Sequence, residues 1–556
     1  MEATTGISIQ SERKKLKREL TLLPLFGLLY FTVCGGAFGA EPMVGYSGPG
    51  LALLLMIITP IVFSIPNMLV VRELQSMMPV EGGYYHWVKR AFGPFMGFMA
   101  GWNNWVVSWL DVSIYPVWAS MYLSYFIPAL DTGATIGGME LSGNFLRWVV
   151  SAILIWAISA LQIRGARLSG LFTNWLGLVM IIPLIIMSAI GIFGWISSGE
   201  TISLPFMPEG STLFGALSVG LYVAMWNFMG WELPAAAGDE IVNPRKTYPR
   251  AMALTLVAAI ATYMLPTVAG LWGGAGANGA WQMWGVESPN EQGGLVAYFM
   301  PEEDFNAEIE SLAVANGVAP EEVTYDDLVA SSPAFAETAT AIEDWGGDPT
   351  VSTGWEFPQI GEVIGNKMGM PGVGTFLGIT VTISAILSMI GLFVGNSLGG
   401  SRVPFALSAD GMFPRFMVKV HPRFGTPWVA IVVVGIIFTI FSWSAFEFLV
   451  VADVFLNTLV ILAYIAALWK LRVTEPDRPR DKVPGGILGL VLVTLGPTLI
   501  IVLAIVSQYS EAGFSSIGWA LAFMALGLLV YLPIRRLVKP GVPDVDPFVA
   551  PEEEED

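Results

Sequence analysis

Four carboxylates fall inside long apolar stretches of this sequence, where a charge is costly and usually faces a cavity. They are Glu41, Asp111, Glu232 and Asp453. Ionised carboxylates bind an ammonium group by charge-assisted hydrogen bonds, and an aromatic face adds cation–π attraction. The aromatic candidates are Phe38, Tyr115, Trp226 and Trp231. We therefore predict that Glu41, Asp111 and Glu232 bind the amino group or groups of a small solute.

Each of these residues also has a plainer interpretation. Glu41 and Asp111 could serve as helix-end or interhelical hydrogen-bonding residues, and the aromatic side chains could simply pack. For Asp453 we favour a capping or pairing role near the membrane surface. The sequence leaves these alternatives open.

Two glycine-containing interruptions precede Glu41 and Glu232. The first runs from Cys34 to Gly39 and the second from Trp226 to Gly230. Glycine and proline weaken a helix, and the backbone groups that they free need partners away from lipid. Ordinary glycine packing explains one interruption, but the matched pair favours a transport site at mid-membrane. The exposed backbone amides of the first interruption would bind any carboxylate of the substrate. The predicted substrate-binding residues at the two interruptions are Gly35, Gly36, Ala37, Phe38, Gly39, Asn227 and Gly230.

The elements that carry these residues are apolar stretches long enough to span a membrane. We predict twelve, at about 20–46, 50–71, 94–127, 146–163, 170–196, 213–238, 250–272, 372–400, 427–441, 444–470, 485–508 and 514–534. Hydrophobic residues make up 54% of the 556-residue chain, far more than one water-soluble core could bury. The predicted fold is an all-α polytopic membrane protein with two inverted five-helix repeats, broken helices 1 and 6, and two peripheral helices.

Charge predicts the orientation. Of 27 Lys and Arg residues, all except Arg147 and Lys367 fall on one side of this topology, and basic loops stay in the cytoplasm. Acidic residues instead gather in 272–366, which has 17 acids and no base, and in the last thirteen residues, which have 7. We expect a cytoplasmic tail (1–19), helices 1–7 (20–272), an acidic extracellular insert (273–371), helices 8–12 (372–536) and an acidic cytoplasmic tail (537–556). The expected location of the protein is the plasma membrane.

Several ordered motifs resemble the amino acid–polyamine–organocation superfamily, and within it the plant-type polyamine-uptake branch. The resemblance rests on the stretches 35–41, 63–66, 79–84, 91–95, 111–117, 237–244, 246–249, 409–414 and 424–427. It implies ten helices in two inverted repeats plus two more, and solute uptake or exchange driven by an ion gradient. The sequence departs from this pattern between about 275 and 354. There we expect either a small helical lid or a flexible acidic loop, and either a merely solvated surface or a funnel for cationic solutes.

Coupling to a proton is our expectation, through Glu41 or Asp111. Ser384 and Ser388, at helical spacing, could instead donate oxygens to Na⁺, although such serines commonly bond the helix backbone. Asp239, Glu240, Arg402 and Asp410 could form an inner gate or lie in a solvated loop.

Several functions are excluded or disfavoured by residue content. One cysteine and two histidines allow no internal disulfide and no Cys- or His-rich metal site. There is no phosphate-binding loop for ATP, and the stretch 395–399 fits a hydrolase nucleophile motif but lies in an apolar helix. We expect no enzyme activity, cofactor, metal or nucleic acid partner. A small amine or amino acid is the expected substrate, leaning to a cationic amine or polyamine; a neutral amino-acid carrier or antiporter is the alternative, and a non-transporting sensor or scaffold the alternative class. The need for a partner subunit is left open.

Overall fold

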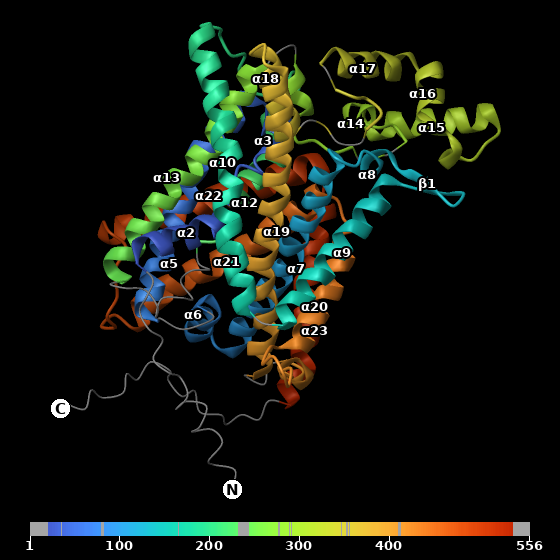
Figure 1. Cartoon of the computed structure of the whole chain (residues 1–556). Helices are drawn as coiled ribbons and strands as arrows, with labels where there is room; N and C mark the ends of the chain where they lie inside the picture. Colours follow the sequence, from blue (N-terminus) through green and yellow to red (C-terminus); the bar gives the residue numbers. More distant parts are fainter. Residues whose placement is uncertain are drawn as a thin grey trace.

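The structure is a computed structural model, and Figure 1 shows its arrangement of helices. It describes residues 21–34, 36–78, 83–164, 166–231, 244–275, 279–288, 290, 292–345, 347–351, 354, 356–409 and 413–537. Gly35, Glu232, Asp239, Glu240 and Asp410 lie outside the described residues.

Each of the twelve predicted spans coincides with helix in the described part of the chain, so the predicted fold class is confirmed. The spans are α2 (Leu22–Val33) with α3 (Glu41–Ser47), α4 (Pro49–Thr59) with α5 (Ile65–Met77), α7 (Pro94–Ser124), α9 (Gly143–Arg164), α10 (Ala166–Ser198), α11 (Leu213–Ser218) with α12 (Gly220–Asn227), α13 (Pro244–Gly270), α19 (Pro371–Ala409), α20 (Trp428–Phe441), α21 (Phe446–Thr474), α22 (Gly486–Ala512) and α23 (Ser515–Leu537). Eight of the described helices are long and apolar enough to cross a membrane unaided; the other spans are shorter, broken or more polar.

The shorter elements lie within or between these spans. They are η1 (Pro60–Ser64), α6 (Gly83–Phe92), α8 (Ala129–Thr132), the antiparallel strands β1 (Ala134–Ile136) and β2 (Met139–Leu141), η3 (Leu271–Ala275), α18 (Phe357–Lys367) and η6 (Arg415–Val418). In the hairpin, Gly137 and Gly138 both have positive φ, as the tight turn between two short strands requires.

The first span is broken where the sequence predicts. Helix α2 ends at Val33 and α3 begins at Glu41. Between them Gly36 and Gly39 have φ values of 109° and 104°, which residues other than glycine rarely adopt. In the sixth span, α12 ends at Asn227, and Gly230 has a φ of 89°; the residues between Trp231 and Pro244 lie outside the described part of the chain.

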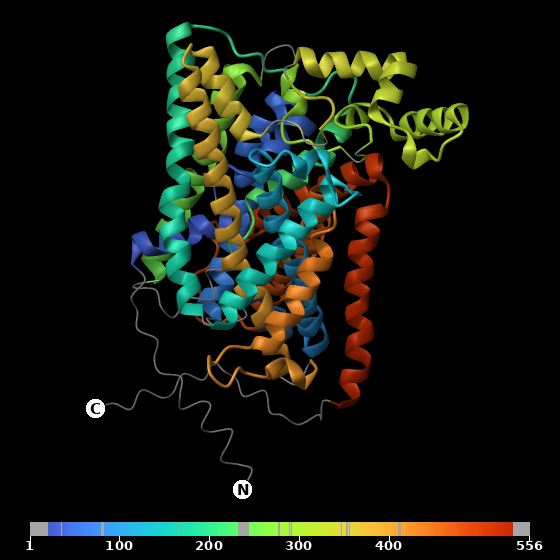
Figure 2. The same cartoon turned by 45° about the vertical axis from the view of Figure 1, so that its right-hand side comes forward.

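Helix α7 lies at the centre of the bundle and packs against α19, α21, α9, α20 and α23. Most of its side chains are buried, as expected for a helix that is apolar on every face. Helix α13 packs against α2 and α10, so it joins the inner half of the first span to the fifth. Helix α23 stands at the edge of the molecule, coloured red at the right of Figure 2, and its outward apolar side chains suit contact with lipid.

The acidic insert is folded. Its helices are η4 (Ala280–Met283), α14 (Val296–Phe299), α15 (Glu302–Asn316), η5 (Pro320–Glu322), α16 (Tyr325–Ser331) and α17 (Pro333–Asp344). In α15, Phe305, Ile309 and Leu312 recur on one face and enter a core separate from that of the spans. At the start of α16, the Thr324 hydroxyl accepts a hydrogen bond from the Asp327 amide, and the Asp327 carboxylate accepts one from the Thr324 amide. This reciprocal pair is a capping box. The insert is therefore helical rather than an irregular loop in its described part.

Candidate transport site

Glu41 is the first residue of α3, directly after the first break, and it is almost fully buried. The Tyr122 hydroxyl, from α7, donates to its Oε2 atom at 2.5 Å. The backbone amide of Phe357, at the start of α18, donates to its Oε1 atom at 2.6 Å. Both carboxylate oxygens are therefore bound by the protein's own donors, one of them 316 residues away in the chain.

Asp111 lies midway along α7 and is only partly buried. Its Oδ1 atom accepts hydrogen bonds from the Tyr115 hydroxyl at 3.0 Å and from the Trp226 indole at 3.1 Å. Its Oδ2 atom accepts none from the described residues, and none of their lysines or arginines forms an ion pair with it. Among the described residues, one oxygen of this carboxylate therefore has no hydrogen-bond donor.

Asn396, in α19, extends this network: its side-chain amide donates to the Tyr115 hydroxyl at 3.2 Å. Asn396 was not predicted, because it lies in the stretch 395–399, which resembles a hydrolase nucleophile motif. An amide side chain midway along an apolar span was the signal.

Side chains satisfy the carbonyl groups that the two breaks release. The Asn227 amide donates to the carbonyl of Gly39 at 2.7 Å, which ties the sixth span to the first. The Tyr263 hydroxyl, from α13, lies 3.0 Å from the carbonyl oxygen of Asn227 and 3.3 Å from that of Cys34. One hydroxyl hydrogen can point to only one of them at a time, so the two breaks share this donor.

Aromatic rings cover the first break. The Trp118 ring stacks on Phe446 at 4.3 Å and meets Trp226 edge-on at 6.0 Å. A Cβ atom on Gly39 would meet rings of both Trp118 and Trp226 at 2.8 Å, so only glycine fits there. Trp118 and Phe446 were not predicted, because ring contacts between distant helices leave no local pattern.

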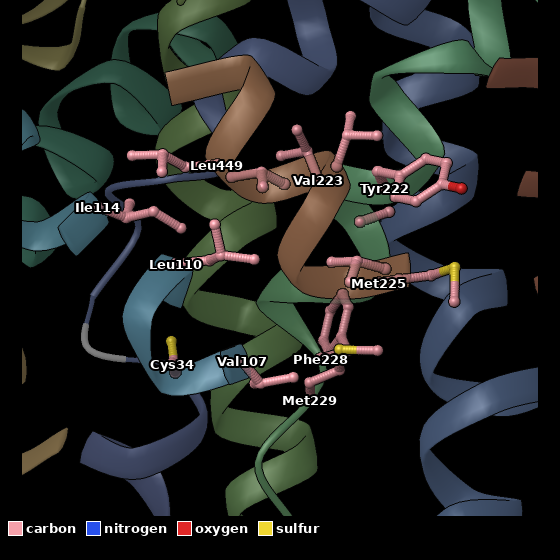
Figure 3. Packing of buried hydrophobic residues seen from close by; sticks show 14 of the residues in the cluster. Cys34, Val107, Leu110, Ile114, Tyr222, Val223, Met225, Phe228, Met229 and Leu449 are labelled. Carbon is pink, nitrogen blue, oxygen red and sulfur yellow. The ribbon is translucent and has the colours of Figure 1, made fainter. Parts of the chain in front are cut away.

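Apolar side chains complete the surroundings of the breaks, as Figure 3 shows. They come from α7, α12, the sixth-span break and α21, and include Val107, Leu110, Ile114, Tyr222, Val223, Met225, Phe228, Met229 and Leu449. Charge-bearing groups are thus confined to a few positions in an otherwise apolar region, which strengthens each electrostatic contact there.

The remaining predicted residues lie in other environments. Phe38 meets Tyr122 edge-on at 5.5 Å, and Ala37 is buried beside it. The fully buried Trp231 indole donates to the carbonyl of Phe228 at 2.8 Å. Ser384 donates to the carbonyl of Met180 in α10. Ser388, on the next turn, and Asp453, in α21, are both buried. Arg402 lies in α19, and the rest of its predicted gate lies outside the described residues.

A bundle of membrane-spanning helices, broken at mid-length around a carboxylate and aromatic rings, defines a polytopic secondary transporter. The sequence profile of the amino acid permease family matches residues 20–277 and 347–531. The chain belongs to this family, which confirms the resemblance to the superfamily. The gap between the two matched parts, 278–346, contains the insert's helices up to α17.

Known relatives agree with this assignment. The chain is 26% identical to "Polyamine transporter RMV1" of Arabidopsis thaliana over 542 residues, 97% of this chain and 90% of that protein. It is 26% identical to "Polyamine transporter PUT1" of Oryza sativa subsp. japonica, over 96% of this chain and 84% of that protein. With "Aromatic amino acid transport protein AroP" of Shigella flexneri it shares 25% identity over 44% of this chain and 50% of that protein.

Among solved structures, MhsT in complex with L-phenylalanine has a similar fold. The TM-score is 0.51 at 13% sequence identity, and the match covers 88% of this chain and 99% of that one. At this identity the match supports the fold alone.

Proposed function

We propose that this secondary transporter carries a small cationic amine, most simply a polyamine, and that Asp111 binds its ammonium group. The observation that carries the proposal is the Asp111 carboxylate, whose Oδ1 atom is held by Tyr115 and Trp226 while Oδ2 accepts nothing from the described residues. A partly buried carboxylate with no cationic partner among the described residues favours a guest that supplies the positive charge.

The surrounding groups suit such a guest. The Trp226 and Tyr115 rings lie 6.3 Å apart beside Asp111, and either face can attract a cation. The names of the two plant relatives, both polyamine transporters, support the same substrate class. Glu232 stays in the proposal as a second carboxylate.

An amino acid is the second candidate substrate. The amides at Gly36 and Gly39 lie at the first break, where the backbone is not helical, and backbone N–H groups of this kind suit a carboxylate. The names of AroP and of the MhsT complex favour this alternative.

Uptake into vesicles tests both candidates. The purified chain is reconstituted, and labelled putrescine uptake is competed by polyamines, by cationic amino acids and by neutral amino acids. We expect competition by polyamines at the lowest concentrations. Competition by neutral amino acids alone would transfer the proposal to the second candidate, and binding without flux would favour a sensor.

A proton is the proposed coupling ion, with Asp111 and Glu41 as its carriers. The hydroxyl of Ser384 donates to the carbonyl of Met180, which gives this serine a structural role that needs no Na⁺. Uptake should follow an imposed pH gradient; uptake driven by a Na⁺ gradient at fixed pH and voltage would overturn this assignment.

The proposed orientation places the insert outside the cell and both chain ends in the cytoplasm of a plasma-membrane protein. Arg147 and Lys367, the two bases expected outside, each pair with acids: Arg147 with Asp131 and Glu287, and Lys367 with Glu200 at 2.7 Å. Proteolysis of intact cells, with an epitope placed at the exposed Val314, tests the insert's side.

A further inference from the structure

The insert is seated on the outer half of the broken first span, and glycines make the contact close. A Cβ atom on Gly285 would lie 2.4–2.5 Å from backbone atoms of Glu41 and Pro42. A Cβ atom on Gly45 would lie 2.5 Å from the carbonyl oxygen of Trp284. Backbone therefore meets backbone between α3 and the segment that leads into the insert, and side chains are excluded from both sides.

Further contacts surround this seat. The Tyr46 ring, from α3, meets Tyr298 of α14 edge-on at 5.8 Å. Trp284 meets Phe357 edge-on at 5.5 Å. Arg147, in α9, pairs with Glu287 at 3.2 Å. The insert is thus attached to the spans where it leaves them and where it returns.

Glu41 joins the two sides of this seat. One of its oxygens binds Tyr122 of the central helix, and the other binds the amide of Phe357, where the chain returns from the insert. The carboxylate lies seven residues after Cys34, at the point where α3 departs from the break. Any tilt of α3 away from α7 would have to break one of these two bonds.

Transporters with broken helices expose their site to each side in turn, by movement of one part of the bundle against another. Helix α3 also packs on the sixth span, where the Ser47 hydroxyl donates to the carbonyl of Ala216 at 2.7 Å. A movement of the two broken spans therefore carries α3 with it, and the insert resists that movement.

We propose that the described residues from 279 to 357 form a lid that holds the outer path closed, and that Glu41, which binds the amide of Phe357 at the end of this segment, is the latch connecting the lid to the first span. Glu41 is then a positioning residue of the gate, distinct from the solute-binding Asp111. The lid restricts entry and so governs how often the site is open to the outside. This inference rests on the proposed transport function and its orientation for its physiological meaning, but its geometry can be tested without any solute.

The first experiment measures the lid's position. Cysteines replace two exposed residues, Val314 in the lid and Met139 in the β1–β2 hairpin, in a Cys34→Ser background, and spin labels report the distance between them. Gly285→Ala places a methyl group against Glu41 and Pro42. The clash should push the lid away from α3 and break the hydrogen bond between the Phe357 amide and the Glu41 carboxylate. We therefore expect a second, longer distance population, with the open-to-closed ratio raised about tenfold, as the loss of one hydrogen bond to a charged group predicts.

Gly317→Ala is the matched control. Gly317 has a φ of 68°, close to the 72° of Gly285, and it also lies in the insert, but nothing stands within 4 Å of its Cβ position. Both variants strain the backbone alike, so only contact with α3 distinguishes them. Tyr122→Phe removes one latch bond without altering the backbone, and it should shift the distances in the same direction even if Gly285→Ala fails to fold.

Identical distance distributions in the unsubstituted pair, Gly285→Ala and Tyr122→Phe would overturn the lid. A shift shared by Gly317→Ala would overturn it too, because strain alone would then explain the effect. Uptake separates the two proposals. Shifted distances without amine flux would retain the lid and refute amine transport. Amine flux with unshifted distances would retain amine transport and refute the lid. If both stand, external KM should fall as the open population rises.

Discussion

The two ends of the bundle balance their acids in different ways. On the side opposite the insert, the fully buried Glu73 of α5 forms a bidentate pair with Arg472 of α21 and also accepts the amide of Val483. Glu475 there lies between Arg90 and Arg478, at 2.7 and 2.9 Å. On the insert side, Glu41 instead binds a tyrosine hydroxyl and a backbone amide, both neutral.

This difference follows from where the bases are. Where arginines are available, buried acids form ion pairs that fix one helix to another, since an unpaired buried charge is costly. Toward the insert, Arg147 and Lys367 pair with a few acids, but the described acids outnumber the bases, and Glu41 accepts from neutral donors instead. The arginine-rich end is therefore suited to hold helices together. The insert side, called the carboxylate end below, is suited to break and re-form the contacts of Glu41.

The largest effect is expected at the arginine-rich end. Arg472→Met leaves the buried Glu73 carboxylate without its cation and should cost about 3–5 kcal/mol of folding free energy. Thermal unfolding in detergent measures the loss. The double variant Glu73→Gln/Arg472→Met should recover most of it; no recovery would mean that the pair is not what stabilises this end.

Substitution of Asp111 should have the next largest effect, and it should act on transport rather than on stability. Asp111→Asn keeps an acceptor for Tyr115 and Trp226 but removes the charge, so the apparent affinity for an amine should fall about a hundredfold. Uptake kinetics give the value, and unfolding temperature serves as the control. Unchanged KM would remove Asp111 from the site.

Tyr263→Phe tests the donor that both breaks share. The carbonyl groups of Cys34 and Asn227 lose their common hydroxyl, at a cost of about 1–3 kcal/mol. Because the ring is retained, packing against Phe228 at 5.3 Å should persist. Thermal unfolding measures the cost, with Tyr222→Phe as a matched control on α12; an equal effect in both variants would deny Tyr263 a special role.

The carboxylate end should also respond to pH. Burial first, and then the nearby charges of Glu41 and Asp131, raise the pKa of Glu356 well above its usual range, although Arg147 opposes this. Because Glu356 binds its proton more tightly in the folded protein than in the unfolded chain, protonated Glu356 contributes to the stability of the folded state at low pH. That contribution is lost as pH rises from the ordinary pKa near 4.5 through the raised pKa of the folded protein. Protection factors, which correct hydrogen exchange for its intrinsic rise with pH, should therefore fall in the insert at higher pH, and Glu356→Gln should flatten this dependence.

The smallest effect is expected at the pair between Lys367 and Glu200, which are 33% and 52% exposed. Solvent screens such pairs, and they contribute about 0–1 kcal/mol. Lys367→Gln should barely change the unfolding temperature. A loss comparable to that of Arg472→Met would contradict the contrast between the two ends.

Local sequence predicted the spans and the breaks well, because apolar length and the run of glycines at 35–39 are local signals. The same signals placed Asp111 and Glu41 in the membrane. Their partners could not be predicted: Phe357 is distant in sequence, Trp118 looks like any packing residue, and Asn396 sits among small residues. Glu73 and Arg472 were overlooked because each lies near the end of a span, where a charge usually faces water.

The folded insert has a consequence for how the chain folds. Its apolar side chains form their own cluster, from Ala280 to Ile342, apart from the core of the spans. The helices α15, α16 and α17 contact their neighbours in the chain, and such local contacts form quickly. In the proposed orientation this segment can therefore fold in water outside the membrane while the spans fold in lipid, so one chain folds in two solvents.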